Sequence, residues 1–461
     1  MPTALGASGC NDTAVVLRIV SNRPSPPGPA GLDAICIELD AGGGQRFGRR
    51  YGLPSLPLPQ TLTVLPAGRS SAQALVFGLQ HGIEVTRARR ELAFKGSTVL
   101  HVDVPLDACA PHPSGAHFTA AAAPSGGAVE AALLLPGPTS TTAGDVALAA
   151  AAGLSARYTV AASGIAALSA GTPAAPAGRA RQLISADLDG DCRPDAILVA
   201  GGAALSAWHN AVDGSFTPLA TVGSADVVAV AAGDVDGDGF VDLVAVGGSA
   251  AHVWINDGAG HFHELAGALD AAPTDATAVA LADLDGDGHL DLVLGQGSAT
   301  AEVARVYLND KGGSAHFTFA AAALPPKPAR VSALAIADVD GDGDLDLVMA
   351  QLGGPVRLYL NRGNAYLDDR SFSLLPDQVS GDVPSLLFTD LDGDCLPDLV
   401  VPRAGAAPLL WTSSGGGKLV ASASFDLAPS ASGAASDDVD GNGTSDVLLY
   451  GGAGLQLELQ K

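Results

Sequence analysis

The chain has 461 residues and a net charge of −25 at pH 7, with 49 Asp and Glu against 24 Lys and Arg. Such a surface repels nucleic acid and anionic membranes, because each phosphate contact needs a cation. Charged residues make up 16% and hydrophobic residues 47% of the chain, which excludes a disordered solvating segment and allows two or three folded domains.

The N-terminus and the cysteines say little about targeting. No apolar run reaches the roughly 20 residues of a membrane span, and the first nine residues lack the Lys or Arg and the length of a signal peptide. Residues 7–10 resemble the end of a bacterial lipoprotein signal, so a lipid anchor at Cys10 stays open as an alternative. A Cys36–Cys109 disulfide is a hypothesis within the first domain, whereas Cys192 and Cys395 are expected to be unpaired.

Residues 12–110 predict a small antiparallel β-sandwich domain. Short β-type runs, several of them alternating, are separated by turn-rich stretches, and they cover residues 13–20, 32–39, 60–65, 72–79, 82–87 and 97–106. A linker is expected at residues 110–115. The domain contains no family-specific motif, so its role is not assigned.

Residues 115–461 repeat one pattern. Six nine-residue segments follow Asp-x-Asp-Gly-(Asp/Asn)-x-x-x-Asp at steps of 47 to 55 residues, and they begin at Asp187, Asp234, Asp283, Asp338, Asp390 and Asp438. Each segment runs into an apolar strand, then a strand with an aromatic residue, a third strand, and a fourth that leads into the next loop. Four short strands in about 50 residues are typical of a β-propeller blade.

The two ends of this region complete each other. Only two strands follow the last loop, residues 447–450 and 455–459. Residues 116–123 echo 315–322, and Asp145 stands where a degenerate loop would end. We therefore predict a seven-bladed β-propeller, all-β, with one blade closed by both chain ends so that no sheet edge is exposed.

The six loops predict calcium sites. Carboxylates at positions 1, 3, 5 and 9 and the carbonyl of position 7 supply hard oxygens, which suit Ca²⁺, whereas Mg²⁺ demands a stricter octahedron. Zinc would need His or Cys, which are absent from the side-chain ligand positions. The glycine at position 4 of every loop allows a tight turn. The candidate metal ligands are Asp187, Asp189, Asp191, Arg193, Asp195, Asp234, Asp236, Asp238, Phe240, Asp242, Asp283, Asp285, Asp287, His289, Asp291, Asp338, Asp340, Asp342, Asp344, Asp346, Asp390, Asp392, Asp394, Leu396, Asp398, Asp438, Asp440, Asn442, Thr444 and Asp446.

Two other interpretations of these loops, an EF-hand and a solvated turn, fit the pattern less well. An EF-hand needs Glu at position 12 and a following helix, but here position 12 is apolar, as in Leu294 and Met349. A solvated turn explains one copy, but six copies in register crowd carboxylates that repel one another without a cation. We expect about six Ca²⁺ per chain, bound at roughly 10⁻⁴–10⁻³ M. Asn442 is expected to weaken the sixth site, and Cys192 and Cys395, each in place of a glycine, make the first and fifth sites differ.

No catalytic motif is present, and we expect no enzyme activity. The chain lacks GxSxG, HExxH, a Walker loop and a helix-opening GxGxxG. His261 and His263 are interpreted as surface residues, and His209 as a packing residue, because other repeats have Ile or Leu there. Recurrence also favours core packing over sugar stacking for the aromatic residues Trp208, Trp254, Tyr307, Tyr359 and Trp411.

The loops and the strands between them resemble the FG-GAP/VCBS repeats, calcium-loop propeller repeats that also occur in integrin α subunits. The resemblance spans residues 115–461 and implies an extracellular or cell-surface propeller, mainly structural calcium, and ligand binding through other loops. Evident Phe-Gly and Gly-Ala-Pro signatures are missing, so integrin-type partners do not carry over. We expect a monomer that serves as a ligand-binding or adhesion scaffold for an extracellular protein or polysaccharide. The alternatives are a lectin-like glycan binder and a calcium-dependent polysaccharide-degrading enzyme, although lysines for such chemistry are rare.

Overall fold

The protein is all-β apart from one short helix among the residues described. A computed structural model describes residues 15–21, 34–40, 46–52, 60–64, 71–80, 83–93, 100–106, 118–121, 128–135, 145–151, 154–161, 164–168, 178–211, 215–223, 227–247, 250–270, 275–297, 304–309, 315–325, 329–376, 381–394, 396–422, 430–439 and 444–460. The helix, α1, covers Ser371–Leu374. No helix in these ranges is long and apolar enough to cross a membrane.

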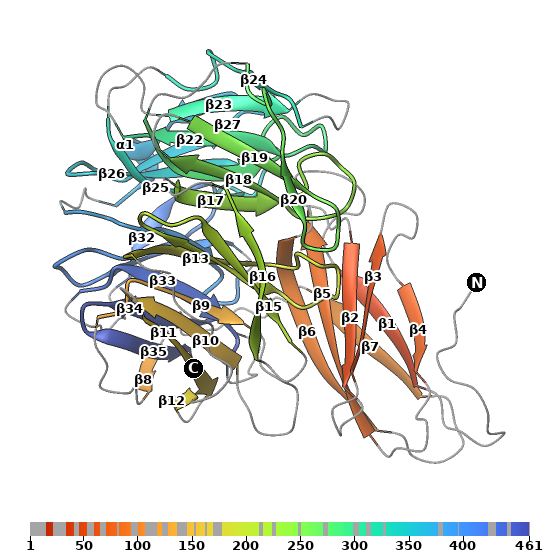
Figure 1. Cartoon of the computed structure of the whole chain (residues 1–461). Coiled ribbons are helices and arrows are strands. Elements are labelled where there is room, and N and C mark those ends of the chain that lie inside the picture. Colours follow the sequence, from red (N-terminus) through yellow and green to blue (C-terminus); the bar gives the residue numbers. More distant parts are fainter. Residues whose placement is uncertain are drawn as a thin grey trace.

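Seven strands before residue 110 form two sheets, with the orders β4-β1-β7 and β3-β2-β5-β6 (Figure 1). Their bounds are β1 (Val15–Ser21), β2 (Ala34–Asp40), β3 (Arg46–Gly52), β4 (Gln60–Val64), β5 (Ser71–Gln80), β6 (Ile83–Ala93) and β7 (Leu100–Leu106). β1 pairs with β7 in parallel, so the expectation of a purely antiparallel domain is wrong for this pair. The sequence pattern does not predict β3, because three arginines and two glycines interrupt its apolar alternation.

The rest of the chain is a β-propeller of four-stranded antiparallel sheets. Among the described residues, six blades are each built from four consecutive strands, where the sequence predicts seven blades in all. These strands are β9 (Ala131–Leu135), β10 (Asp145–Ala151), β11 (Leu154–Ala161), β12 (Gly164–Leu168), β13 (Ala180–Ala186), β14 (Asp195–Ala200), β15 (Leu205–Asn210), β16 (Phe216–Val222), β17 (Val227–Gly233), β18 (Asp242–Gly247), β19 (Ala250–Asn256), β20 (Phe262–Glu264), β21 (Ala276–Ala282), β22 (Asp291–Gln296), β23 (Ala304–Asn309), β24 (Phe317–Phe319), β25 (Val331–Ala337), β26 (Asp346–Gln351), β27 (Arg357–Asn361), β28 (Leu367–Asp369), β29 (Leu387–Thr389), β30 (Asp398–Val401), β31 (Leu409–Ser413) and β32 (Leu419–Ala421).

The remaining sheet of the propeller is composite. It has the order β33-β34-β35-β8, with β33 (Gly433–Asp437), β34 (Asp446–Gly451), β35 (Gly454–Gln460) and β8 (Phe118–Ala121). β8 pairs with β35 antiparallel, from Leu457 opposite Ala121 to Gln460 opposite Phe118. The predicted closure by both ends of the repeat region is therefore confirmed. The expected linker at 110–115 lies outside the described residues, and the domain boundaries stay predictions.

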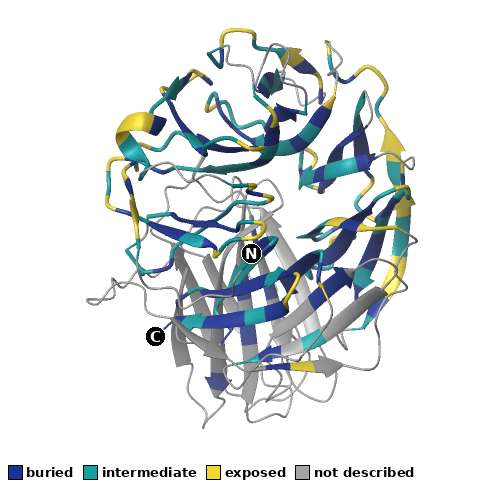
Figure 2. Cartoon of the chain, turned by 90° about the vertical axis from the view of Figure 1, so that its left-hand side faces the viewer, coloured by how far each residue is buried: buried dark blue, intermediate teal, exposed yellow. Residues whose placement is uncertain are grey.

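The hydrophobic core is shared between neighbouring sheets. Every residue of the second strands β14, β18, β22 and β26 is buried (Figure 2, dark blue). Successive side chains of a strand point to opposite faces. Leu243 and Ala245 accordingly pack toward the preceding blade, while Val244 and Val246 pack toward the next. A strand covered on both faces reads as a continuous apolar run, and a run of this kind comes directly after each Asp-rich loop.

The recurrent aromatic residues belong to this core. Trp208, Trp254, Tyr307, Tyr359 and Trp411 are at most 4% exposed, each in an apolar cluster between sheets. The prediction that they pack rather than present a stack to sugars is confirmed. Each Asp-rich loop described in full joins the first strand of a blade to the second, so the packing of neighbouring blades fixes both ends of the loop.

Candidate metal centres

Four Asp-rich loops bring the same three carboxylates together. One oxygen from each of positions 1, 3 and 9 lies within 4.8 Å of the others in the triads Asp187, Asp189 and Asp195; Asp234, Asp236 and Asp242; Asp283, Asp285 and Asp291; and Asp338, Asp340 and Asp346. Oxygen ligands about 2.3–2.6 Å from one Ca²⁺ have such separations. Three of the four predicted side-chain positions therefore lie together in these loops, and their role as metal ligands stays a prediction.

Backbone hydrogen bonds hold each loop in its turn. In the third loop, Asp283 Oδ1 accepts from the amide of Gly286 at 2.8 Å, and Asp283 Oδ2 accepts from that of Gly288 at 2.9 Å. Asp285 Oδ1 accepts from the amide of Asp287 at 3.2 Å. Gly286 has φ +74° and Gly288 has φ +90°, conformations that favour glycine. The loop is thus shaped by its own amides, and a bound cation would meet carboxylates already in place.

The aspartate at position 9 is the most deeply placed acid of each loop. Asp291 is 1% exposed, and its two oxygens accept from the amides of Leu284 and Asn309, both at 2.9 Å. Burial raises the pKa of Asp291 to about 7, and the neighbouring carboxylates of Asp285 and Asp283 add to the rise. A carboxyl group in this state is only partly ionised near neutrality, so a nearby cation would be needed to keep it charged.

The same shift recurs in the other loops. Burial raises the pKa of Asp242, Asp346 and Asp398 to about 7 and that of Asp195 to about 8. Asp446 has the same pair of backbone partners, the amides of Val439 and Gln460. These carboxyl groups lie on the first residues of the second strands, which explains why they are buried. The donor set of positions 1, 3 and 9, all oxygen, fits calcium.

Position 5 is not a member of these four triads, although in the first loop Asp191 lies close to Asp189 and His209. The position 5 carboxylate instead accepts from the amide of position 7, as from Phe240 to Asp238 Oδ1 at 2.8 Å and from Leu396 to Asp394 Oδ1 at 2.8 Å. The carbonyls of position 7 stay predicted ligands. In the sixth loop Asp440 and Asn442 lie outside the described residues, whereas Thr444 is 7% exposed.

In the second, third and fourth loops, an asparagine that the sequence analysis did not single out joins the loop to the preceding blade. Asn309 ends the strand β23, and its Nδ2 donates to the carbonyl of Leu290 at 3.1 Å, next to Asp291. The same nitrogen donates to the carbonyl of Val235, in the loop of the preceding blade, at 2.8 Å. Asn256 and Asn361 make the corresponding pairs of bonds. The repeated Asn after each aromatic and apolar pair was the available signal.

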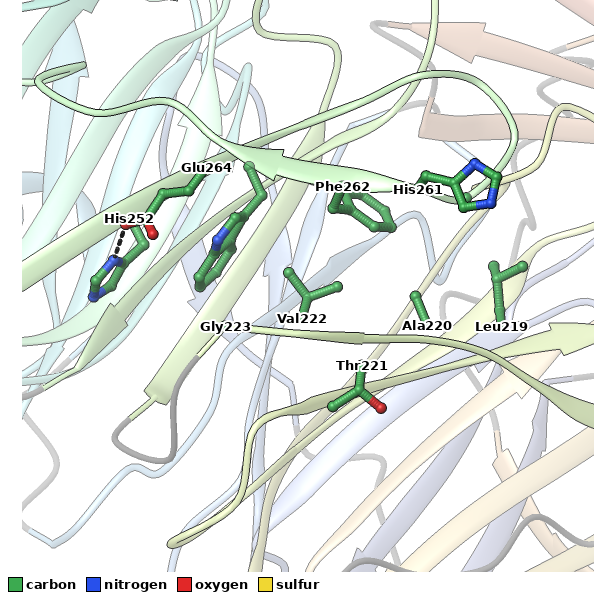
Figure 3. A pocket seen from close by; sticks show the side chains of 11 residues that line it. Leu219, Ala220, Thr221, Val222, Gly223, His252, His261, Phe262 and Glu264 are labelled. Atoms are coloured by element: carbon green, nitrogen blue, oxygen red, sulfur yellow. Dashed lines mark hydrogen bonds and ion pairs between the residues drawn. The ribbon is translucent and has the colours of Figure 1, made fainter.

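A pocket opens between β16 and the strands β19 and β20 (Figure 3). Its volume is about 600 Å³. Phe262 and Val222 line its middle, while His252 and Glu264 lie together at one end. His252 Nδ1 is 2.6 Å from Glu264 Oε1, and the imidazole stacks on Trp254 with ring centroids 5.4 Å apart. The pocket thus joins an apolar wall to an accessible carboxylate.

The first loop departs from the others at Cys192. This residue replaces the second glycine of the loop. Its φ of +69° lies in the left-handed region that favours glycine. Cys192 is disulfide-bonded, and the expectation that it is unpaired is therefore wrong. Spacing alone does not reveal a bond made through the tertiary fold. Cys10, Cys109 and Cys395, and the side chain of Cys36, lie outside the described part of the chain.

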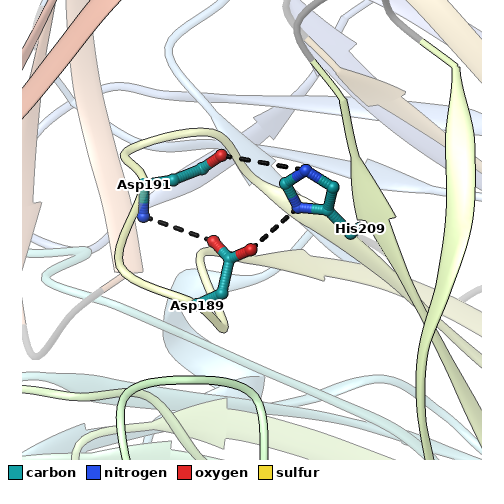
Figure 4. Close-up of side chains that lie close together, drawn as sticks. All are labelled: Asp189, Asp191 and His209. Atoms are coloured by element: carbon teal, nitrogen blue, oxygen red, sulfur yellow. Dashed lines mark hydrogen bonds and ion pairs between the residues drawn. The ribbon is translucent and has the colours of Figure 1, made fainter.

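The first loop also receives a histidine. His209, on β15, points its ring at Asp189 and Asp191 (Figure 4). Its Nδ1 is 2.9 Å from Asp189 Oδ2 and 3.4 Å from Asp195 Oδ1, and its Nε2 is 4.0 Å from Asp191 Oδ2. The packing role predicted for His209 does not match this position. By contrast, the side chain of His261 is 80% exposed, and the surface role predicted for it is confirmed.

The solved structures that match this chain are only distantly similar to it. A lectin of Agrocybe aegerita that recognises non-reducing terminal N-acetylglucosamine is 17% identical, with 69% of this chain and 88% of that chain covered and a TM-score of 0.46. The Saccharomyces cerevisiae protein Sqt1 is 13% identical, with 74% and 97% covered and a TM-score of 0.46. The computationally designed protein Ika8 is 14% identical, with 75% and 100% covered and a TM-score of 0.45. Among curated proteins, none matches.

Family models give a direct assignment. The FG-GAP-like repeat matches five times in tandem, at residues 187–245, 234–294, 296–349, 338–401 and 390–449, and the FG-GAP repeat matches at 276–314. These matches span more than half of the chain and begin, in four of the five tandem cases, at the first aspartate of a loop. With the propeller and the recurrent carboxylate triads, they show that this chain belongs to the FG-GAP repeat family of β-propellers.

Proposed function

We propose that this protein is a non-catalytic calcium-binding β-propeller that acts outside the cell or on its surface as a scaffold for ligand binding or adhesion. The observation that carries the proposal is the carboxylate triad of positions 1, 3 and 9, repeated at the same place in four consecutive blades. The fifth and sixth loops keep the buried position 9 aspartates, Asp398 and Asp446, with the same backbone partners. We therefore extend the assignment to about six ions per chain.

Calcium here has a structural role. The position 9 carboxylate already joins the loop to the third strand, since Asp346 accepts from the amides of Val339 and Asn361 at 2.8 Å each. An ion shared with positions 1 and 3 would neutralise the buried charge and fix the turn between the first two strands. Sites of roughly 10⁻⁴–10⁻³ M affinity fill in extracellular fluid and stay mostly empty in the cytosol. The usual setting of FG-GAP repeats supports an extracellular location.

The experiment is equilibrium dialysis of the full chain at about 1–2 mM free Ca²⁺, near the weak end of such sites. Five or six ions per chain would support the proposal. None or one would contradict it, because the loops would then keep their shape through backbone hydrogen bonds alone.

The pocket between β16 and β19–β20 favours a second candidate, lectin-like glycan binding. Sugars combine hydroxyl groups with apolar faces, and small-molecule sites usually measure about 300–1,000 Å³ and are mostly apolar with a few convergent polar groups. The side chain of Glu264 is 54% exposed and that of His252 28%, so both are accessible to a ligand beside the apolar wall. The carboxylate would accept hydrogen bonds from sugar hydroxyls.

A glycan array compares the wild type with Glu264→Gln and with the control Asp382→Asn, an exposed aspartate elsewhere. Binding that Glu264→Gln abolishes and the control retains would support glycan recognition in this pocket. Equal binding by all three proteins, or none, would contradict it. Incubation of the wild type with acidic polysaccharides tests the non-catalytic assignment. That assignment fails if reducing ends or unsaturated uronates are released.

A further inference from the structure

The first Asp-rich loop differs from the others by a nitrogen donor placed among its carboxylates. At the position of His209, the next three blades have Ile255, Leu308 and Leu360, which present carbon to the loop. Two groups of possible metal ligands in the first loop share Asp189: one consists of Asp187, Asp189 and Asp195, the other of Asp189, Asp191 and His209. The first loop therefore has a nitrogen atom among its possible metal ligands, in addition to carboxylate oxygens.

The histidine nitrogen is buried without a hydrogen-bond partner among the described residues. Nδ1 of His209 has almost no accessible surface and makes no hydrogen bond of acceptable geometry, although Asp189 Oδ2 is only 2.9 Å away. Asp195 Oδ1 is 3.4 Å from the same nitrogen. Donors about 2.0–2.2 Å from one zinc ion lie roughly 3.3–3.6 Å apart in a tetrahedral shell. The two distances from Nδ1 are therefore close to those between ligands around a small ion.

The first loop also carries a positive charge beside its carboxylates, which makes it a weaker calcium site. Arg193 donates to Asp191 Oδ2 and, through Nε, to the carbonyl of Asn210 at 2.9 Å, so its guanidinium group is held beside the carboxylates. One of the four aspartates is thereby offset. At the position of Arg193 the second loop has Phe240 and the third has His289. Calcium depends on hard oxygens and charge, while imidazole suits zinc and other transition metals. Both departures weaken the first loop as a calcium site.

We propose that the first loop selects a divalent transition-metal ion of the zinc type, held by Nδ1 of His209 with the carboxylates of Asp189 and Asp195. Nε2 of His209 faces Asp191, as the second ring nitrogen of a metal-binding histidine commonly faces a carboxylate that orients the ring. The proposal rests on the proposed function only in treating the Asp-rich loops as metal sites. The other loops keep calcium.

The test is equilibrium dialysis of the full chain against about 2 mM Ca²⁺ and a small excess of Zn²⁺ over protein, followed by elemental counting of both metals. The variant is His209→Leu, which installs the residue that Leu308 and Leu360 supply at this place in other blades. The control is His261→Ala, which removes an exposed histidine 2.9 Å from Asp257 that could hold zinc adventitiously. We expect one zinc per chain in the wild type and the control, and none in His209→Leu.

Several outcomes overturn the inference: no zinc in the wild type, undiminished zinc in His209→Leu, or loss of zinc in His261→Ala. If His209→Leu does not fold, X-ray absorption at the zinc edge of the wild type decides, because imidazole scattering supports the site and an all-oxygen shell without imidazole refutes it. Calcium is counted in the same samples. Five calcium ions without zinc would refute this inference alone, and one zinc without calcium would refute the proposed function alone.

Discussion

The third loop allows calcium binding to be separated from the hydrogen bonds that shape the turn. Asp285 contributes one carboxylate to the triad with Asp283 and Asp291, and its Oδ1 accepts from the amide of Asp287 at 3.2 Å. Asp285→Asn keeps an oxygen acceptor at that place and removes the charge. We therefore expect the variant to match the wild type in the presence of a chelator and to be less stable in calcium.

The size of the effect depends on the binding constant. A site with an affinity of roughly 10⁻⁴–10⁻³ M stabilises the folded chain by about 0.6–1.8 kcal/mol at 2 mM Ca²⁺. Losing it lowers the melting temperature by roughly 1–4 °C for a domain of this size.

The assay is thermal unfolding at pH 7.5 with chelator and with 2 mM Ca²⁺, and the matched control is the exposed Asp382→Asn. A calcium-dependent loss confined to Asp285→Asn supports an ion in the third loop. Equal losses in both variants, or a loss of the same size in the chelator, would refute the reasoning, because the effect would then come from the turn or from general charge.

Three further predictions concern the same loops. Asn309→Ala removes the side chain that donates to the buried carbonyls of Val235 and Leu290, so it should destabilise the protein by about 2–4 kcal/mol in urea unfolding. The control Ser413→Ala, at the equivalent place on β31, should cost under about 1 kcal/mol. Similar costs for the two variants would contradict the role of Asn309 between blades. In chelator, stability should rise as the pH falls from 8 to 5, because burial raises the pKa of Asp242, Asp291 and Asp346 to about 7 and a raised folded-state pKa favours the protonated folded form. In 2 mM Ca²⁺ the calcium-dependent gain in melting temperature should instead shrink over that range, since the ligands must lose protons, and a gain independent of pH would show that these carboxyl groups do not bind the ion.

The repeat, the position of the loops and the closure of the composite sheet could all be predicted from the sequence. These features depend on local patterns: Asp spacing, apolar runs after each loop, and the likeness of residues 116–123 to 315–322. The same patterns gave the convergence of positions 1, 3 and 9, because alternate residues of a tight turn point inward together. The buried aromatic residues were likewise predictable, since they recur at one place in the blade.

Features that join distant parts of the chain became visible only in the folded structure. The parallel pairing of β1 with β7 and the disulfide of Cys192 leave no local signature. Asn309 reaches back 74 residues to the preceding blade, and such a bond exists only once neighbouring blades pack. His209 looks like a packing residue in a sequence where its counterparts are apolar, and only the pairing of β14 with β15 brings its ring to the first loop. Local spacing fixes which groups a turn gathers, whereas strand pairing and blade packing fix which groups approach that turn from outside.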